Sequence, residues 1–83
     1  MTENNNTKTL YFKLIKEGKE LYLDIKDENV IFGQVIQELY LKYDWLKMIN
    51  ISNFMIHGFI IDENRTVKQN GINDKEVIII NEK

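Results

Sequence analysis

Residues 53–83 read NFMIHGFIIDENRTVKQNGINDKEVIIINEK. This order predicts a strand, a tight turn at His57-Gly58, a short second strand, a polar loop around Asn64-Arg65-Thr66, one more turn ending in Asn70-Gly71, and a closing strand at Val77–Ile80. Apolar strands separated by short polar turns are typical of a sheet that packs one face against other elements. The second half of the chain is therefore predicted to form the last strands of a sheet. The first half must supply the elements that pack against the apolar face of this sheet.

The segment upstream predicts a β-hairpin. Apolar residues alternate with others from Thr9 onward, pause at Glu17-Gly18 and then resume, which is the signature of two strands around a glycine turn. A three-residue loop with a bulge is the alternative, because Glu17 is a poor turn residue. A two-residue loop at Glu17-Gly18 would place six residues on one face as three facing pairs: Leu14 with Leu21, Phe12 with Leu23, and Leu10 with Ile25.

A helix is expected after the hairpin. Asn29 is the predicted N-cap, and Gly33 would weaken the helix by up to about 1 kcal/mol while permitting close contact with the sheet. Residues 44–52 are too apolar for a bare loop and either extend the helix or form a packed connection. The helix is predicted to run for about four turns because apolar residues recur at three- and four-residue spacing, at Phe32, Val35, Ile36, Leu39 and Tyr43.

These elements predict an α+β fold, a β-grasp in which one helix packs across a mixed sheet of four to five strands. Residues 1–8 carry almost nothing apolar and are predicted to be a flexible tail, followed by one domain at residues 9–83. The positions expected to form the core are Phe12, Leu23, Val35, Leu39, Ile61 and Ile78.

Composition limits the classes of partner and binding site that we expect for this chain. The chain has 83 residues, 43% of them hydrophobic, a net charge of -2 and no cysteine. The charge gives no reason to expect nucleic acid or an anionic membrane as partner, and no apolar run approaches the roughly 20 residues that cross a bilayer. Without cysteine there can be no disulfide and no thiolate zinc site. We therefore expect a cytoplasmic or nuclear protein that needs no cofactor.

No pattern in the sequence supports catalysis or metal binding. His57 is the single histidine and is interpreted as a turn residue, and a lone Ser52 leaves no nucleophile paired with a base. The carboxylates fall in predicted turns or on exposed strand faces. Acidic residues are common at such positions because water solvates their charge, so they need no catalytic role. We expect no catalytic residue, no bound metal and no enzyme activity.

A surface for another protein is the better hypothesis. The alternation places some apolar residues on the sheet face away from the helix, where a contiguous patch with a polar rim is typical of a protein-binding site. Single exposed apolar residues are the alternative explanation. The predicted protein-binding patch consists of Tyr11, Lys13, Ile15, Tyr22, Met55, His57, Ile79 and Asn81.

The run from Gly58 to Ile80 resembles the second half of a ubiquitin-like domain, and the order of elements resembles that family over nearly the whole chain. In ubiquitin an apolar patch on this sheet face binds most partners. By an ungapped match, Met55 stands where ubiquitin has its central patch isoleucine, Ile79 at its patch histidine and Asn81 at its patch valine. The resemblance implies a binding surface in the same place with altered chemistry, so receptors that bind ubiquitin itself should bind poorly.

Two departures from ubiquitin bear on function. No glycine follows Gly71, whereas ubiquitin-like modifiers end in paired glycines that are joined to lysine, and Phe59 and Asp74 stand where ubiquitin carries linkage lysines. The resemblance therefore implies a domain that is not conjugated and that docks to another protein. Two alternatives remain: a structural subunit that self-associates as a homodimer or belongs to a larger complex such as a secretion system, and a modifier precursor lacking its glycine tail.

Overall fold

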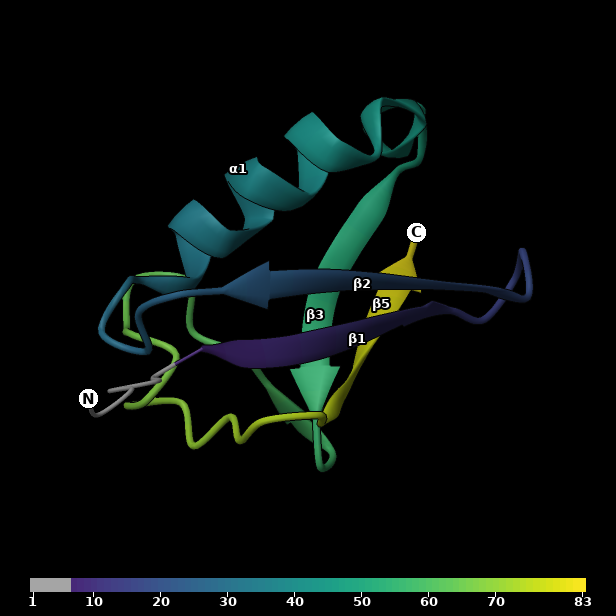
Figure 1. Cartoon of the computed structure of the whole chain (residues 1–83). Coiled ribbons are helices and arrows are strands. Elements are labelled where there is room, and N and C mark those ends of the chain that lie inside the picture. Colours follow the sequence, from purple (N-terminus) through teal and green to yellow (C-terminus); the bar gives the residue numbers. More distant parts are fainter. Residues whose placement is uncertain (1–6) are drawn as a thin grey trace.

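The computed structural model describes residues 7–83 and contains one sheet and one long helix (Figure 1). β1 begins at Lys8, one residue before the expected domain boundary, and residues 1–6 of the tail predicted for residues 1–8 lie outside the described residues. None of the described helices is long and apolar enough to span a membrane. The elements are β1 (Lys8–Leu14), β2 (Lys19–Ile25), α1 (Phe32–Lys42), the 3-10 helix η1 (Asp44–Met48), β3 (Ile51–Ile56), β4 (Phe59–Ile60) and β5 (Val77–Glu82).

The five strands form one mixed sheet in the order β2-β1-β5-β3-β4. β1 and β5 run parallel at the centre, and the other neighbours run antiparallel. Figure 1 shows α1 lying across one face of this sheet, which leaves the opposite face uncovered by the described elements. The expected α+β architecture, with one helix across a mixed sheet, is confirmed.

The hairpin keeps its predicted faces but not its predicted register. Leu10 pairs with Leu23, and Phe12 with Leu21, so each pair is shifted by two residues from the expectation. The shift follows from a wider connection, because Leu14 pairs with Lys19 and residues 15–18 form the loop. Gly18 has a φ of 64° in this loop. A shift of two residues leaves every side chain on its original face, so the apolar side still points to the core.

The N-terminus of α1 is held by loop carbonyls, and the predicted cap was wrong. Helix α1 starts at Phe32 after Ile31, with no side-chain cap, so Asn29 does not cap it. The Phe32 N–H donates to the Arg65 carbonyl at 2.8 Å, and the Gly33 N–H donates to the Glu63 carbonyl at 2.9 Å. A Cβ at position 33 would lie 3.2 Å from that Glu63 oxygen. Gly33 therefore permits close contact with this loop, where contact with the sheet was expected.

Within residues 44–52, which do not extend the helix, residues 44–50 form a packed connection and residues 51 and 52 already belong to β3. Helix α1 spans 11 residues, about three turns rather than the expected four, and ends at Lys42. The 3-10 helix η1 follows at once, and its Leu46 is fully buried. Two apolar neighbours, Trp45 and Ile49, are partly buried against the core. This connection explains why so apolar a segment stands between the helix and β3.

The core lies between α1 and the inner face of the sheet. All six residues predicted for the core are buried, and Phe54 lies at its centre. The Phe54 ring makes edge-to-face contacts with Phe12 of β1, at 6.3 Å between centroids, and with Phe32 of α1, at 5.6 Å. These contacts join helix, central strand and β3. Burying these rings and the aliphatic side chains around them supplies the main driving force for folding.

Candidate functional site

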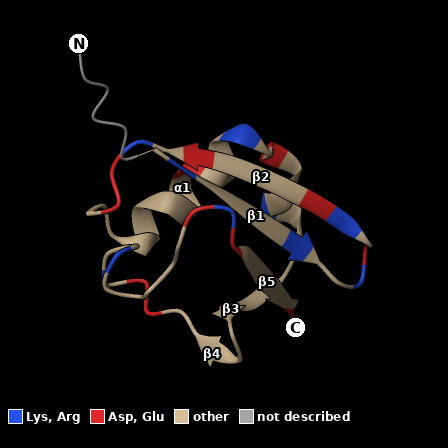
Figure 2. Ribbon diagram, turned by 60° about the horizontal axis from the view of Figure 1, so that its bottom comes forward, with Lys and Arg blue, Asp and Glu red and all other residues tan. Residues whose placement is uncertain are grey.

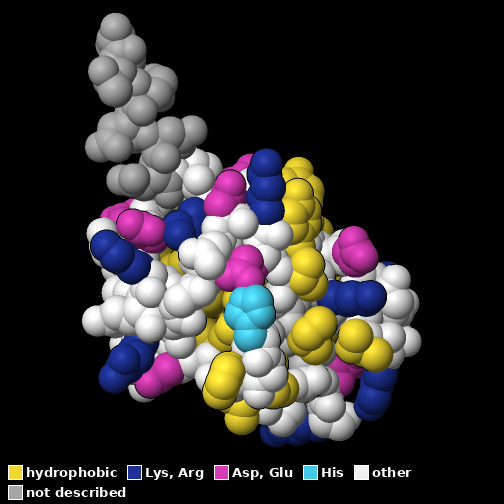
Figure 3. All heavy atoms as spheres, turned by 90° about the horizontal axis from the view of Figure 1, so that it is seen from below, with side chains coloured by type: hydrophobic (Ala, Val, Ile, Leu, Met, Phe, Trp, Pro, Cys, Tyr) yellow, Lys and Arg dark blue, Asp and Glu magenta, His cyan; other side chains and the backbone are white. Residues whose placement is uncertain are grey.

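The sheet face opposite α1 carries the residues that alternate with the core. In β3 and β5, Phe54, Ile78 and Ile80 point inward and are buried, so Met55, Val77 and Ile79 point outward. Figure 3 views the molecule from the side away from α1 and shows groups of hydrophobic side chains beside the single histidine. The alternation predicted from the sequence for these two strands is confirmed.

An apolar row runs across three strands of this face. Met55 of β3 lies directly opposite Ile79 of β5 on one side and opposite Ile60 of β4 on the other. Residues directly opposite in a sheet have Cβ atoms about 4.5–5.5 Å apart, so the three side chains adjoin. Ile60 is 64% exposed, whereas Met55 and Ile79 are half-buried by their neighbours. The row continues into β1, where Lys13 pairs with Ile79.

A second row of large side chains lies beside the first. Tyr11 of β1 is paired with Tyr22 of β2 on one side and with Val77 of β5 on the other. All three are exposed, with Val77 at 50%. Because Tyr11 and Lys13 are two residues apart on one strand, the two rows are adjacent. The structure therefore brings together Tyr11, Lys13, Tyr22, Met55 and Ile79 of the predicted patch.

His57 and Glu76 form one margin of the face. The His57 Nε2 contacts a Glu76 carboxylate oxygen and forms an ion pair when the imidazole is protonated. The Asn73 backbone N–H donates to the other Glu76 oxygen at 2.8 Å. This bond, with a smaller contribution from His57, lowers the pKa of Glu76 below its ordinary value of 4.5 against the opposing effect of burial. The margin thus holds a fixed negative charge next to an exposed imidazole.

The remaining two predicted residues lie at the other end of the face. Asn81 donates from Nδ2 to the Asn53 side-chain oxygen at 2.8 Å, which gives this end a polar border. Ile15 follows β1 in the loop, outside the paired register, and is 57% exposed. Neither residue continues the apolar rows.

Sequence reasoning missed Ile60 and did not include Val77 in the patch. His57 and Gly58 form a two-residue turn with positive φ at both positions, 52° and 81°. Such a turn fixes the pairing of the strands it joins, so Ile56 must lie opposite Phe59 and Met55 opposite Ile60. Counting outward from the predicted turn would have placed Ile60 beside Met55.

The described residues offer little else that could act chemically. Within residues 7–83, no group of three or more histidine and acidic side chains is placed to hold a metal ion. Figure 2 shows acidic and basic residues mixed over the ribbon, with no region of one sign.

Comparison with solved structures supports the fold, whereas no family model and no curated protein matches the chain. The structure is similar to the UBL domain of Plasmodium falciparum Dsk2, with a TM-score of 0.73 at 14% identity over 93% of this chain and 99% of that one. The fold is ubiquitin-like. A de novo designed protein based on ubiquitin gives a TM-score of 0.74 at 12% identity, covering 93% of this chain and 89% of the design.

The ubiquitin-like fold covers more of the chain than its recognisable sequence pattern. The resemblance in sequence was specific only from Gly58 to Ile80, yet the structural similarity spans 93% of the residues. At 14% identity the likeness concerns the fold. The fold by itself does not imply a function, which depends on the residues carried on its surface.

Proposed function

We propose that this chain is a ubiquitin-like interaction module that is not conjugated and that docks to another protein through the sheet face opposite α1. The docking face is defined by Tyr11, Lys13, Ile15, Tyr22, Met55, His57, Ile79 and Asn81, with Ile60 and Val77 added from the structure. In this proposal the module acts without a cofactor, in the cytoplasm or nucleus, and catalyses no reaction.

The row Ile60–Met55–Ile79 carries the proposal. These three adjacent apolar side chains lie on an open sheet face, where Ile60 is 64% exposed and Met55 and Ile79 are only half-buried, so the row leaves apolar surface in contact with water. A partner that covered them would bury apolar area worth about 25 cal/mol per Å². The tyrosines of the second row suit an interface as well, because each combines a broad apolar ring with a hydroxyl that hydrogen-bonds at the rim.

Polar groups at the margins would set orientation. Lys13 lies between Ile79 and Glu20 across the strands, and His57 lies beside Glu76. These groups are exposed or partly exposed, so they can pair with a partner without the cost of burying an unpaired charge. They would contribute specificity and association rate more than affinity.

The proposal is tested with two charge-introducing variants and one matched control. Met55→Asp and Ile79→Asp place a carboxylate in the middle of the apolar row. Leu41→Asp makes the same change at an exposed leucine of α1, which lies on the other side of the molecule. Each protein is immobilised at equal density, and proteins retained from an extract of the source cells are quantified by mass spectrometry.

We expect a partner that binds the wild type and Leu41→Asp and is lost from both patch variants. Recombinant partner would then be titrated, with a loss of affinity of about tenfold or more for Ile79→Asp. A partner retained equally by all four proteins would contradict docking through this face. Sedimentation equilibrium on wild type and Ile79→Asp covers the self-association alternative, since a wild-type dimer broken by Ile79→Asp would make the face an assembly surface.

A further inference from the structure

β2 is an outer strand of the sheet and is hydrogen-bonded along one side only, to β1. An outer strand presents a row of backbone N–H and C=O groups that can accept a further strand. Backbone groups in an antiparallel strand alternate between the two sides, and those of Tyr22 point away from β1. Glu20 and Asp24, two residues away in each direction, therefore also point their backbone groups outward.

Two side chains occupy this outer edge at Tyr22. The Tyr43 hydroxyl accepts a hydrogen bond from the Tyr22 N–H at 3.2 Å and lies 3.2 Å from the Tyr22 carbonyl, to which it donates. The Lys42 ammonium donates to the same carbonyl at 3.0 Å. A single hydroxyl thus makes both bonds that a residue of a neighbouring antiparallel strand would make.

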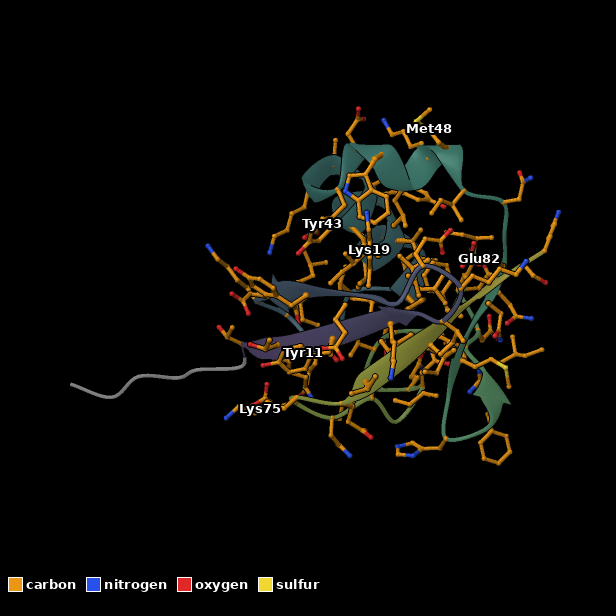
Figure 4. The ribbon with its side chains drawn as sticks, turned by 90° about the vertical axis from the view of Figure 1, so that its right-hand side faces the viewer. Tyr11, Lys19, Tyr43, Met48, Lys75 and Glu82 are labelled. Atoms are coloured by element: carbon orange, nitrogen blue, oxygen red, sulfur yellow. The ribbon has the colours of Figure 1, made fainter. Side chains whose placement is uncertain are left out.

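Further contacts hold the two side chains in place. Lys42 is the last residue of α1, and its ammonium lies 3.3 Å from the centroid of the Tyr22 ring. The Tyr43 ring makes an edge contact with Trp45, at 6.2 Å between centroids, and Lys19 lies 4.6 Å over the Trp45 ring. Figure 4 shows Tyr43 and Lys19 next to each other. These contacts thus hold the last residue of α1, Lys42, and the next residue, Tyr43, against the outer edge of β2.

We propose that the outer edge of β2 is a second interaction surface, complementary to β2 of a second copy of this chain, and that Tyr43 and Lys42 hold it closed. Two identical edges pair antiparallel about a two-fold axis, which extends the sheet continuously from one copy into the other. While Tyr43 and Lys42 occupy the Tyr22 groups, a second β2 cannot make those bonds. Release of these two side chains opens the edge.

Charge selects the register of the open edge. If Tyr22 lay opposite Tyr22 of the second copy, Glu20 would face Asp24, and like charges directly opposite are destabilising. A shift by two residues places Tyr22 opposite Asp24 and Glu20 opposite Lys26, twice over by symmetry. Glu20, Tyr22 and Asp24 lie exposed on the same side of β2, and exposed Lys26 directly follows the strand. The open edge is therefore complementary to itself in the shifted register.

Opening the edge by mutation tests the proposal. Lys42→Ala combined with Tyr43→Ala removes every side-chain bond to Tyr22, and circular dichroism confirms that the fold is kept. Sedimentation equilibrium should then show a monomer–dimer equilibrium with an association constant raised about tenfold or more over the wild type. A folded double variant that remains as monomeric as the wild type at every concentration would overturn the proposal.

Tyr43→Phe tests the closure even if the double variant does not fold. The ring and its packing stay, and only the hydroxyl that bonds Tyr22 is lost. We expect the Tyr22 amide hydrogen to exchange with solvent at least several times faster than in the wild type. Tyr40→Phe, which removes a tyrosine hydroxyl three residues earlier, from α1, is the matched control and should leave that rate unchanged. An unchanged rate in Tyr43→Phe would show that the hydroxyl does not close the edge.

Charge reversal tests the partner and the register. In the opened variant, Lys26→Glu should abolish the dimer, because Glu20 then faces a carboxylate in either register, and adding Glu20→Lys should restore it. An association constant insensitive to these changes would overturn the self-pairing. Ile79→Asp in the opened variant should leave the dimer intact. If Ile79→Asp broke the dimer, the two copies would instead associate through the docking face, the sheet face opposite α1. That result separates failure of this proposal from failure of the docking face.

Discussion

The Asn70 side chain bonds both backbone groups of Asp62: its oxygen accepts the Asp62 N–H at 3.0 Å, and its Nδ2 donates to the Asp62 carbonyl at 2.9 Å. The same Nδ2 also donates to the Thr66 carbonyl at 3.0 Å. These bonds close the loop that contributes the Glu63 and Arg65 carbonyls to the first turn of α1. One asparagine therefore fixes the loop that caps the helix.

Asn70→Ala should lower the free energy of unfolding by about 1–3 kcal/mol, because it leaves backbone groups of the loop without partners. Chemical denaturation followed by tryptophan fluorescence measures the change. Asn64→Ala is the control, since this exposed residue lies in the same loop and contributes only its backbone N–H to a bond with Asp62. Equal effects of the two substitutions would contradict the special place of Asn70.

Leu23→Ala should cost about 2–5 kcal/mol, enough to unfold much of a small domain. Leu23 is buried on the inner face of β2, where truncation removes apolar contacts and leaves a cavity. Leu41→Ala is the matched control, because Leu41 is 79% exposed and should change stability by less than about 0.5 kcal/mol. Denaturant titration of both variants gives the comparison, and a negligible effect at Leu23 would contradict its place in the core.

The sequence predicted the order of the elements, and which face of the sheet each side chain occupies, better than it predicted the pairing register of the hairpin and the ends of α1. Period-two alternation depends only on which side a residue occupies, so a hairpin shifted by two residues still buries Phe12 and Leu23. The loop width that sets the register was decided by residues 15–18, where Gly18 alone does not distinguish a two-residue from a four-residue connection. The same limit applied to α1, because its N-terminus is satisfied by carbonyls from residues 63 and 65, a contact between segments far apart in the sequence.

Eight of the ten residues of the proposed docking face followed from the sequence pattern, and Ile60 and Val77 were added from the structure. Met55 and Ile79 were placed outward by alternation within their own strands. Ile60 joined them only through the geometry of the His57-Gly58 turn. The closure of β2 by Tyr43 had no local signal at all, because it depends on where α1 ends relative to the edge of the sheet.

Replacing either member of a carboxyl pair should stabilise the protein at neutral pH. Interaction with Glu17 raises the pKa of Glu82 above its ordinary value of 4.5. A raised folded-state pKa means that the pair favours the folded state at acid pH and that this advantage is lost as the pH rises through the raised pKa. Glu82→Gln removes the repulsion, so it should unfold at a higher denaturant concentration than the wild type at neutral pH.

That gain should diminish as the pH falls through the raised pKa of Glu82, because protonation of the Glu82 carboxyl removes its repulsion with Glu17 in the wild type. Glu17→Gln should show the same dependence, because either substitution leaves a single carboxyl. Denaturation midpoints measured across the acid range for the three proteins provide the test. A gain for Glu82→Gln that persists unchanged in acid would show that it does not come from the pair.

Glu76 should behave in the opposite way. Its lowered pKa means that the carboxylate stabilises the folded state above the ordinary value of 4.5 and loses this contribution as the pH falls through the lower folded-state value. Glu76→Gln should therefore cost about 1 kcal/mol at neutral pH, by weakening a charge-assisted hydrogen bond, and little in acid. Thermal unfolding of the variant and wild type at several pH values measures the difference.

The two partners of Glu76 should contribute unequally. The hydrogen bond from the Asn73 N–H is the largest single cause of the lowered pKa of Glu76 and persists when the imidazole is removed, so removing the imidazole should cost less than removing the charge. His57→Asn is the suitable change, because asparagine tolerates the positive φ of 52° at this position. If His57→Asn destabilised the protein as much as Glu76→Gln at neutral pH, the imidazole would be the main partner of the carboxylate and the Asn73 bond a minor one.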